Sequence, residues 1–461
     1  MPVWNLSNAK HLLSRALFGY SRKDLEVALS YKTVEEFVTK QLLADKPLPA
    51  PPDVWINEVP VANNNTVDGD RYRAFTYWWY QNMLTEGTNM REKMVLFWHN
   101  HFVSGRDKVN YPQHMYKQQD LFRKAAWGNL QQLTKDISID PAMLIYLDGR
   151  VSSGNGTNVP NENYARELME LFTIGIGNYT EADIRQAALA LSGWRVNGLN
   201  STFNQGAWLN ANKTFMGKTG NFRYNDIVDI IFARTETPEF ICRKLYKEFV
   251  YYKSNEAFVK EMAKVLVANK FEIKPVLQFM LTSDEFFNPQ YQGSKIKNPT
   301  EMSIGILKSL DIKTVGATDL SYIYDQTRNM QQQLLQPPNV RGWVGQRDWI
   351  SSTTYVLRGG FASSILDPTG RGINGQRFAL RVMPVDYART FKSPEAATKL
   401  VADVIDLFLQ VPITSKKEKF LLDTMLDGTI TTNWSTSTPG ADKRIRNLLT
   451  AIMRLPEFQM C

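Results

Sequence analysis

Carboxylates crowd one short segment of the sequence that otherwise has the apolar pattern of a helix. Glu162, Glu167 and Glu170 flank Arg166 within residues 161–175. Carboxylates in this number could act as general bases or as metal ligands. The same charges also fit ion pairs one helical turn apart, which contribute about 0.3–0.5 kcal/mol each on an exposed surface. A ligand site and a structural helix surface therefore both remain open.

His99 and His101, two of the chain's four histidines, are separated by a single residue. Neutral imidazoles bind zinc, iron and copper, so the pair is a candidate divalent metal site. An extended backbone would place both rings on one face, whereas on an α-helix they would diverge by about 200°. The carboxylates that could complete such a site are Asp148, Glu162, Glu167 and Glu170. The alternative is that both histidines are hydrogen-bonded structural residues.

Helices must position both segments, because apolar residues recur at helical spacing over most of the chain. Asn161 or Asn163 is expected to cap the carboxylate-rich helix, and Gly175 to end it. Thr180 and Asp183 form a capping-box pattern at the start of the next helix. Further helices are expected near residues 7–19, 33–43, 70–102 with a break at 87, 115–135, 226–310, 392–410, 415–427 and 440–457. The predicted fold class is mainly α, a multi-helix globular array with long irregular loops and little or no β-sheet.

Two segments, residues 196–222 and about 334–375, lack the helical pattern. Long loops inside compact domains are often functional, so residues 196–222 and 336–358 are expected to form a recognition surface. The candidate recognition residues are Trp194, Trp208, Lys213, Asn339, Arg341, Trp343 and Trp349. The tryptophans at 208, 343 and 349 could also stack on sugars, which leaves polysaccharide binding open.

The expected domain division has its boundary near residue 310. A helical core domain at residues 1–310 would contain the inserted loop 196–222. The C-terminal part at residues 311–461 would consist of an irregular segment and helices that pack on the core. One continuous domain over residues 1–461 is the alternative.

Charge and cysteine content exclude some classes. The 461 residues include 54 Lys and Arg against 46 Asp and Glu, and these charges are interleaved rather than blocked, so nucleic-acid binding is not expected. Cys242 and Cys461 are too few and too far apart for a disulfide framework. The sequence shows neither a signal-peptide pattern nor a membrane-spanning apolar run, which predicts a cytoplasmic protein.

Several blocks resemble, in the same order, the bacterial family catalogued as domain of unknown function 1800. They include FWHNHF at residues 97–102 and PPNVRGW at residues 337–343. Further blocks lie at residues 11–19, 141–148, 161–175, 179–183, 192–194, 213–217 and 456–459. The resemblance covers nearly the whole chain and implies a large, mostly helical protein. It implies no activity, because none is established for the family.

The resemblance also implies a partner. Members of the family are often encoded beside a secreted sulfatase-like family that carries a twin-arginine export signal. A sulfatase-like protein is therefore the expected partner, and export of a folded complex with it would place the chain in the periplasm or outside the cell.

One departure from the family pattern concerns chemistry. A number of relatives read ELHT where this chain reads ELFT at residues 170–173, so Phe172 stands in place of a histidine. If that histidine is a ligand or a proton carrier, its role is absent here.

The leading expectation is a non-catalytic binding or assembly protein with a polar pocket. The pocket is expected where the first helix, with His11 and Arg15, meets residues 99–101 and the helix 162–170. One alternative is a metal-dependent hydrolase, with the two paired histidines as ligands and one of the three glutamates as a ligand or general base. The other is a polysaccharide-binding protein.

Overall fold

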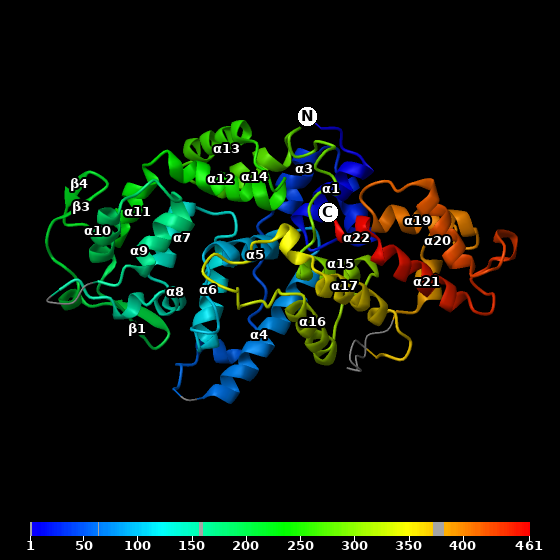
Figure 1. Ribbon diagram of the computed structural model, residues 1–461, viewed down its shortest axis with the longest axis horizontal. Coiled ribbons are helices and arrows are strands. Elements are labelled where there is room, and N and C mark those ends of the chain that lie inside the picture. The colour runs from blue at the N-terminus through cyan, green and yellow to red at the C-terminus, as the bar shows by residue number, and fades with distance from the viewer. Residues whose placement is uncertain (1, 63, 156–159, 372–381) are drawn as a thin grey trace.

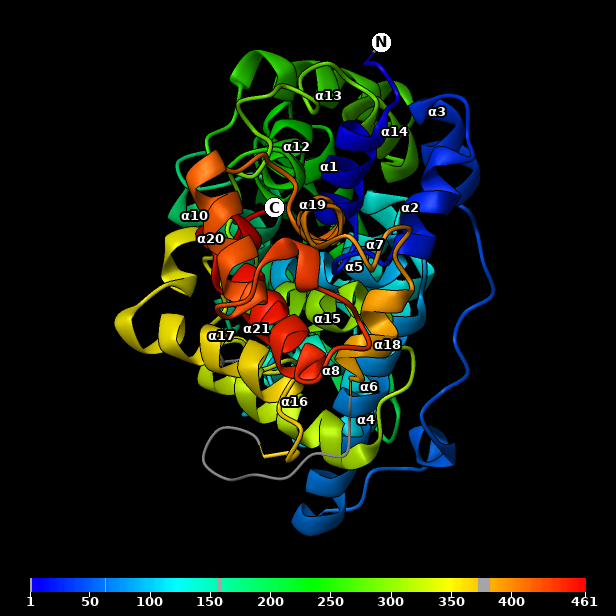
Figure 2. The ribbon, with the colours of Figure 1, turned by 90° about the vertical axis from the view of Figure 1, so that its right-hand side faces the viewer.

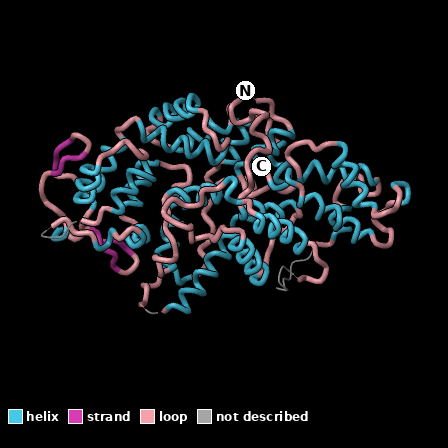
Figure 3. The backbone as a smooth tube through the Cα atoms, in the orientation of Figure 1, coloured by secondary structure: helices cyan, strands magenta, loops and turns pink. Residues whose placement is uncertain are grey.

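Helices make up nearly all the regular structure in the computed structural model, which describes residues 2–62, 64–155, 160–371 and 382–461. Strands are confined to two short hairpins (Figure 3), so the predicted mainly α class is confirmed. Across these ranges, no helix combines the length and the apolar character needed to cross a membrane.

The bounds of the elements are as follows in chain order. The first part contains α1 Leu6–Ala16, α2 Arg22–Leu29, α3 Val34–Phe37, α4 Asn65–Thr85, α5 Arg91–His101, α6 Pro112–Lys124, α7 Leu130–Ser138, α8 Pro141–Tyr146, α9 Asn163–Glu167 and α10 Glu181–Leu191. The strands β1 Trp194–Asn197, β2 Asn200–Phe203, β3 Lys213–Phe215 and β4 Lys218–Gly220 come next. They are followed by α11 Tyr224–Phe232, α12 Glu236–Phe249, α13 Glu256–Ala268, α14 Ile273–Leu281, α15 Pro299–Ser309, α16 Ala317–Asn329, α17 Ser352–Ile365, α18 Pro384–Arg389, α19 Ala397–Phe408, α20 Ser415–Leu426, α21 Ala441–Arg454 and α22 Pro456–Gln459.

The helices form an array that is longest along the horizontal of Figure 1. Helices α7 to α11 and both hairpins lie at one end, α19 to α21 lie at the other, and α1, α5 and α15 lie between them. Figure 2 looks onto the second end, where α21 packs on α17, α18, α19 and α20. One buried apolar cluster contains residues from Ala9 to Phe458, so both of the expected domains contribute to it. The boundary near residue 310 stays a prediction.

Capping signals explain where two neighbouring helices begin. Thr180 Oγ1 accepts the Asp183 N–H at 3.2 Å and the Asp183 carboxylate accepts the Thr180 N–H at 2.9 Å, which confirms the predicted capping box. The preceding helix starts differently from the prediction, because its N-cap residue is Glu162. Asn161 Oδ1 instead accepts the N–H of Asn163 at 2.9 Å within the same turn.

The carboxylate-rich helix is not regular throughout. Helix α9 ends at Glu167 and continues as the π-helical turn Leu168–Thr173, in which Thr173 Oγ1 donates to the Leu168 carbonyl at 2.5 Å. Gly175 follows the end of this turn, in the C-terminal stop position predicted for it, with a φ of 80° that favours glycine. Short π-helical turns are rare and often mark functional sites.

Residues 196–222, predicted as an irregular loop, lie largely in two β-hairpins. β1 pairs with β2 and β3 with β4, both antiparallel, with Asn197 opposite Asn200 and Phe215 opposite Lys218. Each pair is joined by two residues, and Met216 and Gly217 both have positive φ. Such turns match the twist of the strands they connect.

The segment 334–375, also predicted as irregular, contains α17. Ser351 caps this helix by accepting the Thr354 N–H at 3.1 Å. Gly359 and Gly360 hide the helix from a sequence pattern, because glycine disfavours a helix interior by about 1 kcal/mol. The Cβ position of Gly359 lies 3.6 Å from the Arg454 side chain of α21, so close packing between the helices offsets this penalty.

Candidate functional site

A cavity of about 500 Å³ lies beside α5 and α12, and we name it the α5–α12 pocket. Four separate stretches of the chain contribute to its lining. The lining includes Phe97, Asn100 and His101 of α5, Lys244, Lys247 and Glu248 of α12, Lys295 and Asn298 before α15, and Arg341, Trp343 and Trp349 before α17. The predicted site residues that the pocket brings together are His101, Arg341, Trp343 and Trp349.

A larger cavity of about 720 Å³ lies between α1, α19 and α20. Two of its charged groups, Lys10 and Asp406, pair with each other at 2.7 Å. None of the predicted site residues lines it. The α5–α12 pocket is therefore the stronger candidate.

His101 and Lys244 meet at the pocket wall although 143 positions separate them. Lys244 Nζ lies 3.0 Å from His101 Nδ1 and donates to the Leu171 carbonyl at 2.8 Å. Burial and then the Lys244 charge hold the pKa of His101 well below its usual value, against a weak opposing effect of the Phe172 backbone. A neutral ring that accepts from Lys244 through Nδ1 carries its proton on Nε2. His101 is only 3% exposed, and Nε2 has no hydrogen-bond partner within the described part of the chain.

Lys244 itself is a half-buried lysine without a counter-ion. Burial and then the charge of Lys247 lower the pKa of Lys244 to about 7. Among the described residues, no carboxylate lies within 4.0 Å of either ammonium. Near neutral pH, Lys244 is therefore divided between its charged and neutral forms.

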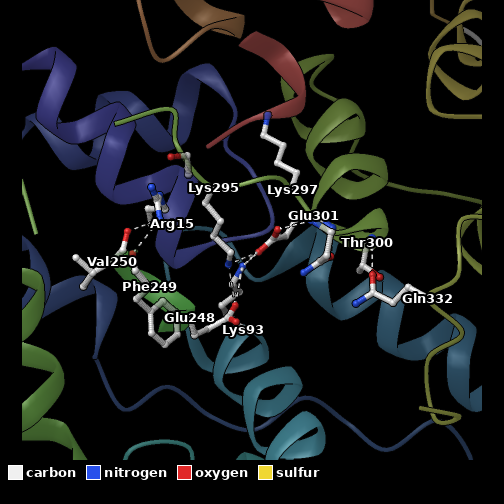
Figure 4. A network of polar contacts seen from close by, with 12 residues as sticks. Arg15, Lys93, Glu248, Phe249, Val250, Lys295, Lys297, Thr300, Glu301 and Gln332 are labelled. Atoms are coloured by element: carbon white, nitrogen blue, oxygen red, sulfur yellow. Dashed lines mark hydrogen bonds and ion pairs between the residues drawn. The ribbon is translucent and has the colours of Figure 1, made fainter. Parts of the chain in front are cut away.

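A buried ion network supports the pocket from behind (Figure 4). Glu301 of α15, 2% exposed, pairs with Lys93 of α5 and with Lys295 at 3.3 Å, while Lys295 also pairs with Glu248 at 2.9 Å. Burial alone would lower the pKa of Lys295, but the charges of Glu248 and Glu301 raise it. Lys295 is consequently a fixed positive charge in the pocket wall.

Asn100 holds the segment before α17 against α5. Its Oδ1 accepts the Trp343 N–H at 2.7 Å and its Nδ2 donates to the Trp343 carbonyl at 3.2 Å. A Cβ on Gly342 would lie 2.2 Å from Asn100 Oδ1, and the φ of 77° also favours glycine. Trp343 is 7% exposed and its ring centroid lies 5.8 Å from that of His99. It therefore anchors the wall and does not present an open face for a sugar.

The two paired histidines have different surroundings on α5. The His99 ring lies between Trp79 and Trp343, and burial lowers its pKa to about 3. His101 instead packs on Phe97 and Phe102. Within the described ranges, no three His, Cys, Asp or Glu side chains are grouped so that they could hold a metal ion. The side chains present do not fit the predicted metal site.

Phe172 lies beside the pocket histidine. Its ring centroid is 6.0 Å from that of His101 and 5.3 Å from that of Phe102, and the side chain is buried. The position where a number of relatives carry a histidine is thus filled here by an apolar ring.

The predicted residues of the first helix do not line the pocket. His11 Nε2 lies 3.0 Å from the Phe286 carbonyl, and burial and then the Arg15 charge lower its pKa to about 3. Arg15 is fully buried and donates to the Val250 carbonyl at 2.7 Å and to Ser294 Oγ at 3.1 Å. In Figure 4 it points to the C-terminal end of α12, where a cation is favoured by the helix dipole.

Arg166 and Glu162 form ion pairs outside the pocket. Arg166 makes a two-pronged contact with Glu181 of α10, at 2.8 and 2.9 Å, and lies 3.6 Å from Glu162. Asn161 and Asn163 belong to the same turn. These residues tie α9 to α10.

The other predicted carboxylates are divided between two places. Glu170 accepts the Tyr179 hydroxyl at 2.9 Å and lies 3.7 Å from Arg341, which lines the pocket. Burial and then the Glu170 charge raise the pKa of Glu167. Asp148 lies outside the pocket after α8, with a φ of 59°. Glu170 is therefore the predicted carboxylate that makes an ion pair with the described pocket lining.

The remaining loop candidates order their own segments. Lys213 Nζ lies 4.4 Å above the Trp208 ring, and Trp208 is only 5% exposed. Trp194 begins β1. Asn339 Oδ1 accepts the Arg341 N–H at 2.9 Å. Of these residues, Arg341 lines the α5–α12 pocket and the others do not.

Sequence reasoning predicted Arg341 but missed the other three cations of the lining, Lys244, Lys247 and Lys295. Lys244 and Glu248 are four residues apart on α12, beside the buried positions Ile241 and Leu245. A lysine at the edge of a buried helix face was the available signal, and it is too common to indicate a site. Lys295 lies in a connection without any pattern.

Comparisons with curated proteins and with solved structures give no match. A family described as protein of unknown function (DUF1800) matches residues 11–460. The match spans the whole pocket, and the two blocks at residues 97–102 and 337–343 supply part of its wall. Because the match covers nearly the entire sequence, the chain belongs to the DUF1800 family.

Proposed function

We propose that this protein binds a ligand through an oxyanion, a carboxylate, sulfate or phosphate group, in the α5–α12 pocket. The observation that carries the proposal is the unbalanced charge of the lining. Among the residues of the lining, Lys247, Lys295 and Arg341 accompany one carboxylate, Glu248, which leaves an excess of two positive charges before Lys244 is counted. Glu301 and Glu170, which contact Lys295 and Arg341, are not part of this lining. Ion pairs and hydrogen bonds to charged groups are the strongest polar contacts available to such a ligand.

Lys295 and the segment that carries Arg341 are held in place before a ligand arrives. Lys295 is fixed by Glu248 and Glu301, and the Arg341 segment is pinned to α5 by Asn100. Groups that are already positioned lose little conformational entropy on binding. The 3% exposed His101, with Nε2 unpartnered among the described residues, adds a donor at the same wall.

The other predicted functions have less support. Trp208, Trp343 and Trp349 are each less than a tenth exposed, so they offer little open ring surface for a polysaccharide. Hydrolysis with His99 and His101 as metal ligands would need a donor set that the described residues do not form. Assembly with a sulfatase-like exported protein stays a prediction, which co-purification and location of the chain with and without that partner would test.

Isothermal titration with sulfate, phosphate and citrate at constant ionic strength tests the proposal. At least one of these anions should bind more tightly than chloride, and Lys247→Met should weaken its binding about tenfold or more, because a hydrogen bond to a charged group contributes about 1.5–3 kcal/mol. Lys264→Met is the matched control, since Lys264 is exposed on α13 and paired with Glu261. Equal affinities in the wild type and Lys247→Met, or no preference over chloride, would refute the proposal.

A further inference from the structure

The geometry points to Lys244 as an amine nucleophile that forms a reversible imine with an aldehyde or ketone group of a ligand in the α5–α12 pocket. The inference deepens the proposed function and rests on it for the anionic part of that ligand. The ligand class is therefore an anionic carbonyl compound, in which a carboxylate, sulfate or phosphate accompanies the carbonyl.

The hydrogen bonds of Lys244 suit the neutral amine. Its two acceptors are His101 Nδ1 at 3.0 Å and the Leu171 carbonyl at 2.8 Å, and both are uncharged. A neutral amine has two N–H groups, so these acceptors satisfy both and leave the lone pair for a carbonyl carbon. An ammonium has three donors, and the third finds no partner among the described residues.

Three other buried lysines have partners that suit the charged ammonium. Lys93 and Lys295 pair with the Glu301 carboxylate, which favours their charged forms. Lys213 donates to the carbonyls of Leu209 and Ala211 and to Asn221, so an ammonium there uses all three donors. Lys244 differs from each of them by having two neutral acceptors and a place in the lining of a cavity.

The electrostatic surroundings act in the same direction. The other charged residues of α12 that line the pocket are Lys247 and Glu248, and Glu248 is engaged by Lys295 at 2.9 Å. Burial and the Lys247 charge lower the pKa of Lys244 to about 7. Desolvation and a neighbouring cation are the usual means of activating a lysine for imine formation. At pH 7.5 its neutral fraction is several hundred times, on the order of 10²–10³, that of an ordinary lysine.

The reaction balances without an oxidant or reductant. The nitrogen lone pair forms a C–N bond to the carbonyl carbon, and the C=O π electrons move to oxygen. Both amine protons leave with that oxygen as water, and a C=N bond remains. Lys247 and Arg341 lie in the same lining and can hold the anionic group of the ligand.

Pyridoxal 5′-phosphate is a suitable probe, because it combines an aldehyde with a phosphate. The wild-type protein is incubated at pH 7.5 with the probe, reduced with borohydride, digested and mapped by mass spectrometry. We expect the main adduct at Lys244, formed at least about tenfold faster than at the exposed Lys264. Lys244→Arg retains the charge and should abolish this adduct, whereas Lys264→Arg should leave it unchanged.

Pyridoxal, which lacks the phosphate, separates the two proposals. Equal modification of Lys244 by both aldehydes would support the nucleophile and overturn oxyanion binding. Reversible binding of pyridoxal 5′-phosphate in competition with phosphate, without an adduct at Lys244, would overturn the nucleophile and support the pocket. An adduct spread evenly over surface lysines such as Lys264 would overturn the nucleophile as well. The wild-type map decides this even if Lys244→Arg folds poorly.

Discussion

Replacing Glu301 by glutamine should destabilise the fold by about 3–5 kcal/mol, because it leaves a buried ammonium without its main anion. Glu301 is 2% exposed and contacts Lys93, which is 1% exposed. Its second oxygen accepts the Asn298 N–H at 2.7 Å at the start of α15. Glutamine keeps a side-chain oxygen for that cap but removes the charge. Among the described carboxylates, Lys93 then retains Glu248 alone, at 4.0 Å.

The distances set the size of the effect. Two unit charges at the 3.3 Å between Lys295 Nζ and Glu301 Oε1 attract by about 5 kcal/mol at an effective dielectric constant of about 20. Removing the Glu301 charge loses an attraction of about this size. The cations that remain are still buried away from water, and the lost anion no longer offsets that cost. Lys295 keeps Glu248 at 2.9 Å, so most of the penalty falls on Lys93.

Urea unfolding at pH 7, followed by tryptophan fluorescence, measures the loss. Glu261→Gln is the matched control, since Glu261 is half-exposed on α13 and its pairing with Lys264 contributes less than about 1 kcal/mol. The double variant Lys93→Met with Glu301→Gln removes the stranded ammonium and should recover a large part of the stability. If Glu301→Gln destabilises the protein by less than about 1 kcal/mol, Lys93 is not a desolvated cation and the account of the network is wrong.

Two further predictions concern the pocket wall and the buried histidines. Gly342→Ala should destabilise the protein by about 2–4 kcal/mol and weaken anion binding, because its Cβ would clash with Asn100 at a φ of 77°. Wild-type affinity in this variant would show that the wall tolerates movement. Burial holds the pKa of His11 and His99 near 3, below the ordinary histidine pKa of 6.5, so the unfolded chain binds more protons between those values. Stability should therefore fall as the pH drops below 6.5, by about 2 kcal/mol per histidine between pH 8 and pH 5, and His99→Leu should remove its share of this pH dependence in urea titrations.

Local signals predicted the helices well, and their failures have local causes. The capping box of Thr180 and the stop at Gly175 depend on neighbours within four residues, so a sequence contains them. The hairpins were not predicted, because strands of three or four residues are too short to show an alternation of apolar and polar residues. Asn197 and Gly198 do form a favourable hairpin turn signal. Helix α17 was not predicted, because its two central glycines disfavour a helix. Packing against α21 stabilises the helix nonetheless.

The site was harder to predict because it is assembled by long-range packing. Periodicity placed His101 on a helix, but nothing in the sequence indicated that Lys244, 143 positions away, would donate to its ring. The carboxylates were the more conspicuous residues in the sequence. Glu162, however, forms an ion pair with Arg166 one helical turn away, outside the pocket. The spacing of the two histidines singled out His101, but the packing of Phe172 against its ring was not predictable from the sequence.

The buried network and the pocket share Lys295 and Glu248, but stability and binding should still be separable. Glu301→Gln strands Lys93, which lies behind the wall, while Lys295 keeps its partner and its place in the lining. That variant should therefore lose stability and retain anion affinity while it is folded. Lys247→Met removes an exposed cation with no ion pair among the described residues, so it should lose affinity and retain stability. If the two variants instead lose both properties together, the network and the pocket form one cooperative unit, and the positive lining is maintained for folding rather than for a ligand.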